Sequence, residues 1–315
     1  MISVVQFGTV DYATGLRLQQ QLIALRKEEK IGDVLLLLEH KPVITLGRNA
    51  KPANVVASTD LLKQRGVELF DCDRGGDVTF HGPGQLVGYP IFDLRGYARP
   101  TATSDPLSSS ANSKTLSSRA EENGSKSRSL ESRDLVSPVR KHLGAVDFVR
   151  CLEDVLIRTC ADFAIPTKRI PGLTGVWTDP EARNLHVGTA ALGRSIERSS
   201  TAPESKLAAI GVHISRSVTS HGFALNVNTD LSYFNLIVPC GITSKPVTSM
   251  QHQLGRELDL NAVAESISRN FGVVFQSQIL WADTLDAVLG RPVGVPMKPP
   301  VELRQIHKED DTTWA

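Results

Sequence analysis

One cysteine of the chain stands in a stretch that suits a reacting group. The stretch "VPCGITSKPVTS" places Cys240 between a proline and a glycine, in a loop that follows an apolar strand. An isolated cysteine is usually a small buried hydrophobic residue, but a Pro-Cys-Gly loop is a poor place to bury one. The other cysteines, Cys72, Cys151 and Cys160, lie in strand-like or helical stretches where packing explains them well. Cys240 is therefore the candidate nucleophile.

A cysteine reacts as its thiolate, and an unperturbed thiol has a pKa of about 8.5, so it needs a nearby cation or base near neutral pH. The candidates for this partner are Lys206, Lys245, His81, His213 and His221. Lys206 opens a predicted strand whose next residues, "LAAIG", are small or apolar, so its ammonium group could be partly desolvated. From spacing alone, Lys206 could equally be an ordinary lysine at a strand edge.

A glycine-rich block precedes the cysteine in the chain. The segment "RGGDVTFHGPGQ" sets Gly75, Gly76, Gly82 and Gly84 around a short predicted strand. Backbone without side chains can approach a ligand closely. Glycine clusters are also common in tight turns, and the histidine could be purely structural. The residue types alone favour neither interpretation.

Hydrophobic spacing predicts the elements that must position these residues. Strands are expected at 33–40, 67–70, 77–80, 85–92, 175–178, 206–215 and 221–228, and helices at 13–29, 146–163 and 260–275. The second helix carries one apolar face, formed by Phe148, Leu152, Val155, Leu156 and Cys160. Strands and helices do not alternate regularly as in a parallel βαβ array, so the predicted fold class is α+β.

The same patterns divide the chain into one catalytic domain, residues 1–280, and a loose proline-rich C-terminal tail, residues 281–315. Two insertions interrupt the domain. The first, residues 98–143, is rich in serine and shows no periodicity, which predicts disorder. The second, residues 179–205, is polar.

Composition excludes several classes of function. A net charge of +1 over 315 residues gives no reason to expect a nucleic-acid or membrane-surface binder. The four cysteines form no CxxC pair, which argues against a zinc site or a disulfide scaffold and fits a reducing compartment. The start lacks the pattern of a secretory signal, and no stretch is apolar enough to cross a bilayer.

Three long blocks resemble the signature blocks of the octanoyl (lipoyl) transferases, in the same order. They are "RGGDVTFHGPGQLVGYP", "KLAAIGVHISRSVTSHGFALNVNTDLSYF" and "IVPCGITSKPVTS", and "LLLLEHKPVITLGR" is similar to that family's first strands. Together these stretches cover most of residues 3–95 and 147–275. The insertions and the tail depart from the compact family pattern.

The resemblance implies a fold and a reaction. The fold would be the mixed β-sheet with flanking helices that biotin and lipoate protein ligases share. The reaction would move an octanoyl (or lipoyl) group from acyl carrier protein to a lysine on lipoyl domains of 2-oxoacid dehydrogenase E2 subunits or glycine-cleavage H protein. Cys240 would form a thioester acyl-enzyme, and Lys206 would help to ionise the thiol and later accept a proton from the incoming amine. A thioester donor already carries an activated acyl group, so no cofactor is expected.

The resemblance also implies which residues bind the substrate. These are Arg74, Gly75, Gly76, Asp77, Val78, Thr79, Phe80, His81, Ala209, Ile210, Gly211, Gly222, Phe223 and Ala224. The glycines would provide backbone walls and N–H donors for the acyl chain and its oxyanion. His221 is expected to line the same site, without an assigned role.

Two alternative functions stay open. An ATP-dependent lipoate or biotin-type ligase could use the glycine block and Lys206, but it would need no nucleophilic thiol. A catalytically silent binder of acylated domains would need neither Cys240 nor Lys206. The serine-rich insertion suggests a eukaryotic, fungal-like chain, and eukaryotic members of the family work in mitochondria, so a mitochondrial location is expected although no presequence is visible.

Overall fold

The computed structural model describes residues 1–98, 142–182, 203–242 and 244–289. Most of both predicted insertions, and the tail from residue 290 onward, lie outside the described residues. The predicted disorder of the serine-rich insertion and the predicted loose tail therefore stay predictions. In the described part of the chain, no helix is both long enough and apolar enough to span a membrane.

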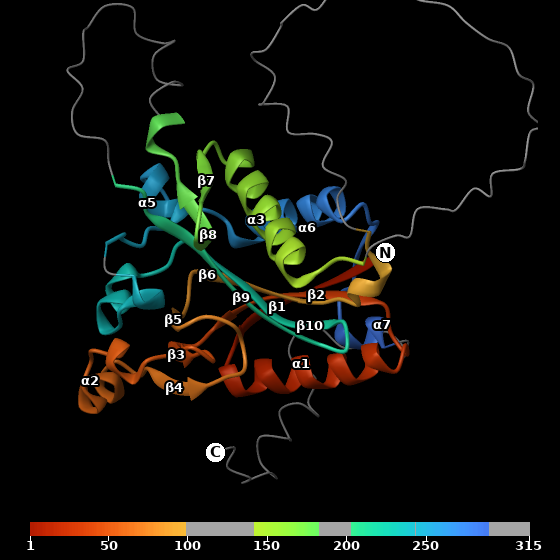
Figure 1. Ribbon diagram of the computed structural model, residues 1–315, viewed down its shortest axis with the longest axis horizontal. Helices are drawn as coiled ribbons and strands as arrows, with labels where there is room; N and C mark the ends of the chain where they lie inside the picture. The colour runs from red at the N-terminus through yellow and green to blue at the C-terminus, as the bar shows by residue number, and fades with distance from the viewer. Residues whose placement is uncertain (99–141, 183–202, 243, 290–315) are drawn as a thin grey trace, which may run out of the picture.

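An eight-stranded mixed sheet forms the centre of the fold, in the order β11-β1-β2-β6-β10-β9-β8-β7 (Figure 1). Its strands are β1 (Ile2–Val10), β2 (Asp33–His40), β6 (Gln85–Ile91), β7 (Thr167–Ile170), β8 (Leu173–Thr178), β9 (Lys206–Ser215), β10 (Val218–Asn226) and β11 (Ile279–Trp281). Strand β1 pairs in parallel with β2 and β11, and all other pairs are antiparallel. The sheet and its helices confirm the predicted α+β class.

Helices cover both faces of this sheet. Helices α3 (Ala145–Asp162) and α6 (Leu260–Val274) lie on one face, and α1 (Tyr12–Lys27) lies on the other (Figure 1). Strand β2 is buried on both sides, with alternate residues in the two cores, which explains its continuous apolar run "DVLLLLEH". The predicted apolar face of α3, from Phe148 to Cys160, is fully buried, as the spacing predicts.

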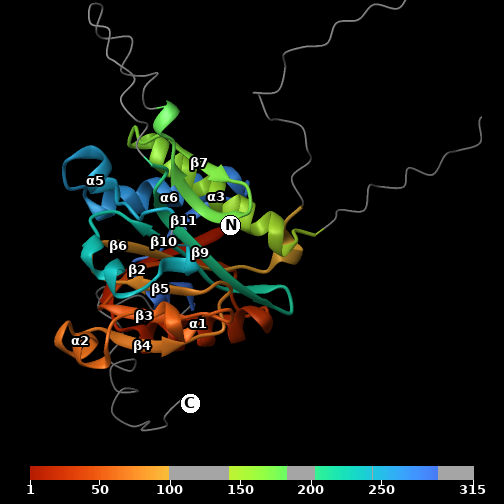
Figure 2. The same ribbon diagram turned by 60° about the vertical axis from the view of Figure 1, so that its left-hand side comes forward.

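A smaller three-stranded sheet lies beside the main one, on the side of α1 (Figure 2). It contains β3 (Val43–Leu46), β4 (Glu68–Asp71) and β5 (Val78–His81), in the order β4-β3-β5. It has its own small core, which includes Leu62 of α2 (Thr59–Gln64). The glycine-rich block therefore spans β5 and the loops on either side of it.

The chain stays ordered beyond the predicted domain boundary at residue 280. Strand β11 spans this boundary and pairs with β1, and α7 (Leu285–Val288) packs Leu285 into the core beneath α1. Strands β1 and β11 were not predicted, because β11 is an edge strand of three residues and the apolar residues of β1 show no clear period. Helix α5 (Met250–Leu254) was missed because it is shorter than two turns.

Candidate active site

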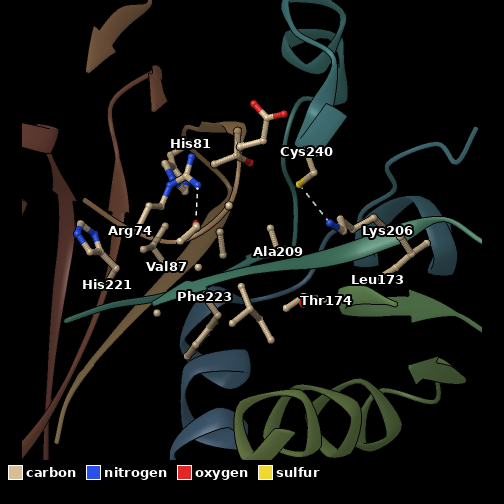
Figure 3. A pocket seen from close by; sticks show the side chains of 18 of the residues that line it. Arg74, His81, Val87, Leu173, Thr174, Lys206, Ala209, His221, Phe223 and Cys240 are labelled. Atoms are coloured by element: carbon tan, nitrogen blue, oxygen red, sulfur yellow. Dashed lines mark hydrogen bonds between the residues drawn. The ribbon is translucent and has the colours of Figure 1, made fainter. Parts of the chain in front are cut away.

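A thiol and an ammonium group meet at one end of a cavity. Lys206 Nζ donates a hydrogen bond to Cys240 Sγ at 3.2 Å, although the two residues are 34 positions apart (Figure 3). Lys206 is 7% exposed, whereas Cys240 is partly open to solvent. The contact places a group that can give and take a proton directly beside a thiol that lines the cavity.

The backbone of Cys240 is in an uncommon conformation. The residue lies in the 3₁₀ turn η4 (Pro239–Gly241) with φ 55° and ψ 18°, a left-handed geometry that few residues with a side chain adopt. The next residue, Gly241, also has a positive φ, of 66°. A Cβ on Gly241 would lie 2.9 Å from Asp77 Oδ2, so glycine lets the turn pack against that carboxylate. The packed turn fixes the direction in which the thiol points.

The segment after Cys240 holds Lys206 in place. Lys206 N donates to Pro246 O at 2.8 Å, and Thr248 N donates to Lys206 O at 2.9 Å. The chain therefore leaves the cysteine turn and pairs directly with the start of β9. The ammonium group also lies 4.9 Å from the ring centre of the buried Trp177, where a cation and an aromatic face attract. Backbone hydrogen bonds and the contact between the ammonium group and Trp177 thus both hold the lysine in place.

The second lysine candidate is engaged elsewhere. Lys245 Nζ donates to Glu204 Oε2 at 2.5 Å, and Glu204 also pairs with Lys168 at 2.8 Å. Lys245 lies farther from the Trp177 ring, at 6.0 Å. The geometry therefore separates the two lysines and places Lys206, which the family resemblance selects, beside the thiol.

The three histidine candidates bond to partners other than Cys240. His81 Nδ1 donates to Gln85 Oε1 at 2.8 Å. His221 Nε2 donates to Asp73 Oδ1 at 2.7 Å, and His213 Nδ1 contacts the other oxygen of the same carboxylate. The hydrogen bond from His221 holds the pKa of Asp73 well below its ordinary value.

A cavity of about 270 Å³ extends from the thiol along β9 and β10 (Figure 3). Its lining from the predicted set consists of Cys240, Lys206, Arg74, Gly75, Gly76, Asp77, Thr79, His81, Ala209, Ile210, Gly211, Gly222, Phe223 and Ala224. Ala209 lies opposite Ala224, and Gly211 lies opposite Gly222, across the two strands. Small side chains at these paired positions leave room for an extended chain above the sheet.

The roof of the cavity is the loop that carries Arg74 and Gly75. Gly75 N donates to Val212 O at 3.1 Å, which brings the loop down onto β9. A Cβ on Gly211 would lie only 2.6 Å from Gly75 O. The guanidinium of Arg74 donates to the carbonyl oxygen of Thr45 at 2.7 Å, which ties the roof to the small sheet. Glycine is therefore required where roof and floor approach most closely.

Two residues of the predicted set do not line the cavity. Val78 and Phe80 are 0% and 1% exposed and pack in the small core beneath β3 and β5. Successive side chains of a strand point to opposite faces, so in β5 only Thr79 and His81 face the cavity. Residues 74–81 were all expected to bind the substrate. The structure corrects this expectation for Val78 and Phe80, whose side chains face away from the cavity.

His81, which lines the cavity, and its neighbour His40 are neutral at ordinary pH. Burial lowers the pKa of His81 to about 3, with smaller effects of the charges on His40 and Arg74. Burial likewise lowers the pKa of His40 to about 4. His40 Nδ1 donates to Val10 O, so its Nε2 accepts from the Tyr89 hydroxyl at 2.6 Å. These rings position neighbouring groups and carry no charge near pH 7.

The helical cysteines fit a packing role. Burial raises the pKa of Cys151 to about 11 and that of Cys160 to about 12, so neither thiol ionises near neutral pH. Within the residues that the structure describes, no group of three His, Cys, Asp or Glu side chains is arranged to hold a metal ion.

Comparisons with known proteins show the family of the chain. Residues 11–141 and 133–272 match the family described as "Lipoyl protein ligase A/B catalytic domain". An octanoyltransferase of Koribacter versatilis is 50% identical over 310 residues, which cover 98% of each chain. An octanoyltransferase of Acidobacterium capsulatum is 46% identical, over 90% of this chain and 94% of its own. The chain belongs to the octanoyltransferase family. It is therefore an acyltransferase.

Solved structures of ligases share the fold of this octanoyltransferase family member. A lipoate-protein ligase A bound with ATP superposes with a TM-score of 0.55, at 12% identity, over 98% of this chain and 95% of its own. A bipartite lipoate protein ligase from Thermoplasma acidophilum gives 0.54 at 13% identity, over 94% and 99%. At such identities the likeness shows the common fold alone, and it confirms the predicted ligase-like sheet.

The octanoyltransferase site contains residues that the sequence analysis did not select. These are Val87, Tyr89, Gly172, Leu173, Thr174 and Ile242. They come from three separate elements and share no motif, so only the folded chain brings them together. Trp177 and Asp73 were missed for the same reason. A signal was present at Val87 and Tyr89, which lie inside the first signature block, and at Ile242, which lies inside the third.

Proposed function

We propose that the chain carries an octanoyl group from the thioester of an acyl carrier protein to a lysine of a lipoyl domain, with a thioester on Cys240 as the intermediate. The observation that supports this most is the 3.2 Å contact between Lys206 Nζ and Cys240 Sγ at one end of a narrow cavity. A nucleophile beside its proton donor, with room for an acyl chain next to it, is what two successive acyl transfers need.

In the first half-reaction the thiolate of Cys240 attacks the carbonyl carbon of the donor thioester. The resulting tetrahedral intermediate carries the negative charge on oxygen and collapses by breaking the bond to the carrier's sulfur. The Lys206 ammonium gives its proton to that leaving sulfur. The products are an octanoyl thioester on Cys240, a free thiol on the carrier and a neutral Lys206.

In the second half-reaction the neutral amine of the acceptor lysine attacks the same carbonyl carbon. Lys206, now neutral, accepts the proton that this nitrogen loses, and the bond to Cys240 Sγ breaks as the amide forms. The thiolate and the ammonium group are then restored together. Because each proton passes through the same nitrogen, one lysine serves as acid in one step and as base in the next.

The ligase and binder alternatives are less well supported. A ligase that adenylates a free acid has no use for a thiol, whereas here the lysine contacts one directly. The ligase structures resemble the chain only at 10–13% identity, whereas octanoyltransferases reach 50%. A silent binder would have no need to keep Cys240 beside Lys206.

The acceptors and the location belong to the same proposal. We propose lipoyl domains of 2-oxoacid dehydrogenase E2 subunits and glycine-cleavage H protein as acceptors, on the basis of the family resemblance. A mitochondrial location stays a prediction, and the relatives from Koribacter and Acidobacterium, which are bacterial, give it no support. Imaging of the protein in its own cells is the test, and a purely cytosolic signal would contradict the prediction.

The experiment that tests the function compares two acyl sources. In one arm, the full chain is mixed with octanoyl acyl carrier protein and an isolated lipoyl domain, without nucleotide. In the other arm, the donor is free octanoate with ATP and magnesium. We expect octanoylation of the domain, seen by mass spectrometry, only in the first arm. Modification only in the second arm would assign the chain to the ligases.

A further inference from the structure

His221 forms the end of the cavity opposite the reactive thiol. Figure 3 shows Cys240 and Lys206 at one end of the lining and His221 toward the other. The imidazole lies against Tyr89, with ring centres 6.4 Å apart, and both rings line the cavity. Between the two ends the floor is formed by small residues of β9 and β10.

The backbone turns the His221 ring toward the cavity. In β10, Ala224 packs on the α1 side of the sheet and Phe223 on the opposite side, so regular alternation would place the His221 side chain on the side of Phe223. Instead His221 has a φ of 55°, a left-handed conformation that redirects the side chain. Strand β6 has Pro90 near this point, which lacks the N–H needed to continue the pairing with β10. The irregularity in the sheet therefore creates the end wall.

Hydrogen bonds hold His221 rigidly in this place. Its backbone N–H donates to Gln19 Oε1 of α1 at 2.7 Å, and its Nε2 donates to Asp73 Oδ1 at 2.7 Å. The His221 side chain is only 4% exposed. Its partner Asp73 belongs to the loop that forms the roof, so the bond also joins roof to floor at this end. A chain that pushed the ring aside would have to break these contacts.

The distance along β10 can be compared with the length of an acyl chain. Ala224 lies near the thiol end, where it lines a smaller pocket together with Lys206 and Cys240, and at the usual rise of an extended strand His221 is about 10 Å farther along β10. An extended chain advances about 1.2 Å per bond, as an extended peptide backbone does, so the seven bonds from the carbonyl carbon to the methyl carbon of octanoyl span about 8 Å. An octanoyl chain would end just before the imidazole, and a dodecanoyl chain would overrun it.

We propose that His221, held by Asp73 and Gln19, is the residue that limits the length of the acyl chain. This inference rests on the proposed function, because it assumes an acyl group on Cys240. It assigns His221 a contact with the end of the substrate chain, which differs from a role in proton transfer. The proposal also explains why a buried polar ring closes this end of the cavity. Hydrogen bonds can fix a polar ring in place, and the small residues of the floor make no such side-chain bonds.

The test measures rates of acylation of Cys240 by octanoyl and dodecanoyl acyl carrier protein, read by intact mass. The principal variant is His221→Gly, because glycine accepts a φ of 55° and removes the ring. His221→Asn is the second variant, since asparagine also tolerates this backbone. The matched control is His213→Ala, which removes the other histidine from Asp73 but lies outside the cavity lining.

We expect the wild-type chain to prefer octanoyl by at least tenfold, and His221→Gly to lower this ratio about tenfold or more, with a smaller effect in His221→Asn. His213→Ala should leave the ratio unchanged. A purely structural role for His221 would slow both donors equally and keep the ratio. An unchanged ratio in an acylated variant, or equal rates for both donors in the wild-type chain, would overturn the inference. If octanoyl fails to acylate the wild-type chain at all, the proposed function itself fails.

Discussion

Lys206 Nζ and Cys240 Sγ lie 3.2 Å apart because the segment after the cysteine turn pairs with the first residue of β9. The hydrogen bonds to Pro246 and Thr248 fix the backbone of the lysine, and its ammonium group lies over the ring of Trp177. The distance is thus set by the fold and not by a chance rotamer of a flexible side chain.

Lys206→Ala should slow both half-reactions, by about 10²- to 10⁴-fold, which is the usual contribution of a general acid or base. It should also slow alkylation of Cys240 by iodoacetamide near neutral pH, because the thiolate loses its neighbouring cation. Alkylation should recover at high pH, where the thiol ionises without help. Both rates can be followed by mass spectrometry on the same samples.

Lys245→Ala is the control for this experiment. Lys245 lies five residues beyond the cysteine, but its ammonium group is bound to Glu204. Its loss should leave alkylation and transfer near the wild-type rates. Should Lys245→Ala suppress alkylation while Lys206→Ala does not, the wrong lysine has been assigned.

Gly211→Ala should block the cavity without disturbing the thiol. The new Cβ would lie 2.6 Å from Gly75 O and 3.3 Å from Arg74 Cδ, so the roof must move away from β9. We expect the rate of octanoyl-enzyme formation to fall at least tenfold, while iodoacetamide still labels Cys240. Gly32→Ala is the matched control, because a Cβ there meets nothing within 4 Å. Equal acylation rates in the two variants would show that the roof does not cover the acyl chain.

Removal of residues 101–137 should preserve folding and transfer. The ends of this region are already adjacent: Ala98 and His142 form an antiparallel bridge, and Leu143 N donates to Tyr97 O at 3.2 Å. A short linker can therefore join them, and loop length affects closure entropy only logarithmically. The free energy of unfolding, from urea denaturation, should change by no more than about 1 kcal/mol. Insoluble protein after the deletion would show that the segment packs against the domain.

Two buried histidines should make the stability depend on pH below about 6.5. The folded-state pKa values of His81 and His40 are lowered to about 3 and about 4, so the unfolded chain binds their protons first as pH falls. The stability that the neutral rings contribute is complete above pH 6.5 and is lost progressively down to about pH 3–4, at up to about 1.4 kcal/mol per pH unit for each ring.

The variant His81→Gln measures how much of this pH dependence comes from the protonation of His81. Urea denaturation at pH 7, 6, 5 and 4 should give a shallower loss of stability in the variant than in the wild-type chain. The difference in slope should approach one proton per molecule. Identical slopes would show that His81 is already charged in the folded protein.

The sequence predicted the elements with strong periods and missed those without them. Helix α3 and strands β2, β9 and β10 were all found, because each has a continuous apolar run or a complete apolar face. Strands β1 and β11 were missed, because both depend on pairing with distant parts of the chain. Strand β1 pairs with β2 on one side and with β11 on the other. That pairing joins the two ends of the described chain, and no local pattern reports it.

The features of the site also divide into those that the sequence predicted and those that only the folded chain shows. Cys240 could be selected because its neighbours, a proline and a glycine, make burial for packing implausible. The choice of Lys206 over Lys245 needed the family resemblance, since spacing treats the two alike. The contact of Lys206 with Trp177, and the bond between His221 and Asp73, depend on strand register and on one residue with a positive φ. Such features follow from three-dimensional packing and leave no mark on a linear pattern.

The central claim is the thioester on Cys240, and the most direct measurement is the mass of the chain after brief incubation with octanoyl acyl carrier protein, followed by peptide mapping. The wild-type chain should gain one octanoyl group on the peptide that contains Cys240, and should lose it when a lipoyl domain is added. Cys240→Ser should keep the fold, because exchanging sulfur for oxygen in this turn hardly alters the volume, yet should gain no octanoyl group. Transfer at the wild-type rate by Cys240→Ser, or an octanoyl group found on another residue of the wild-type chain, would contradict the account.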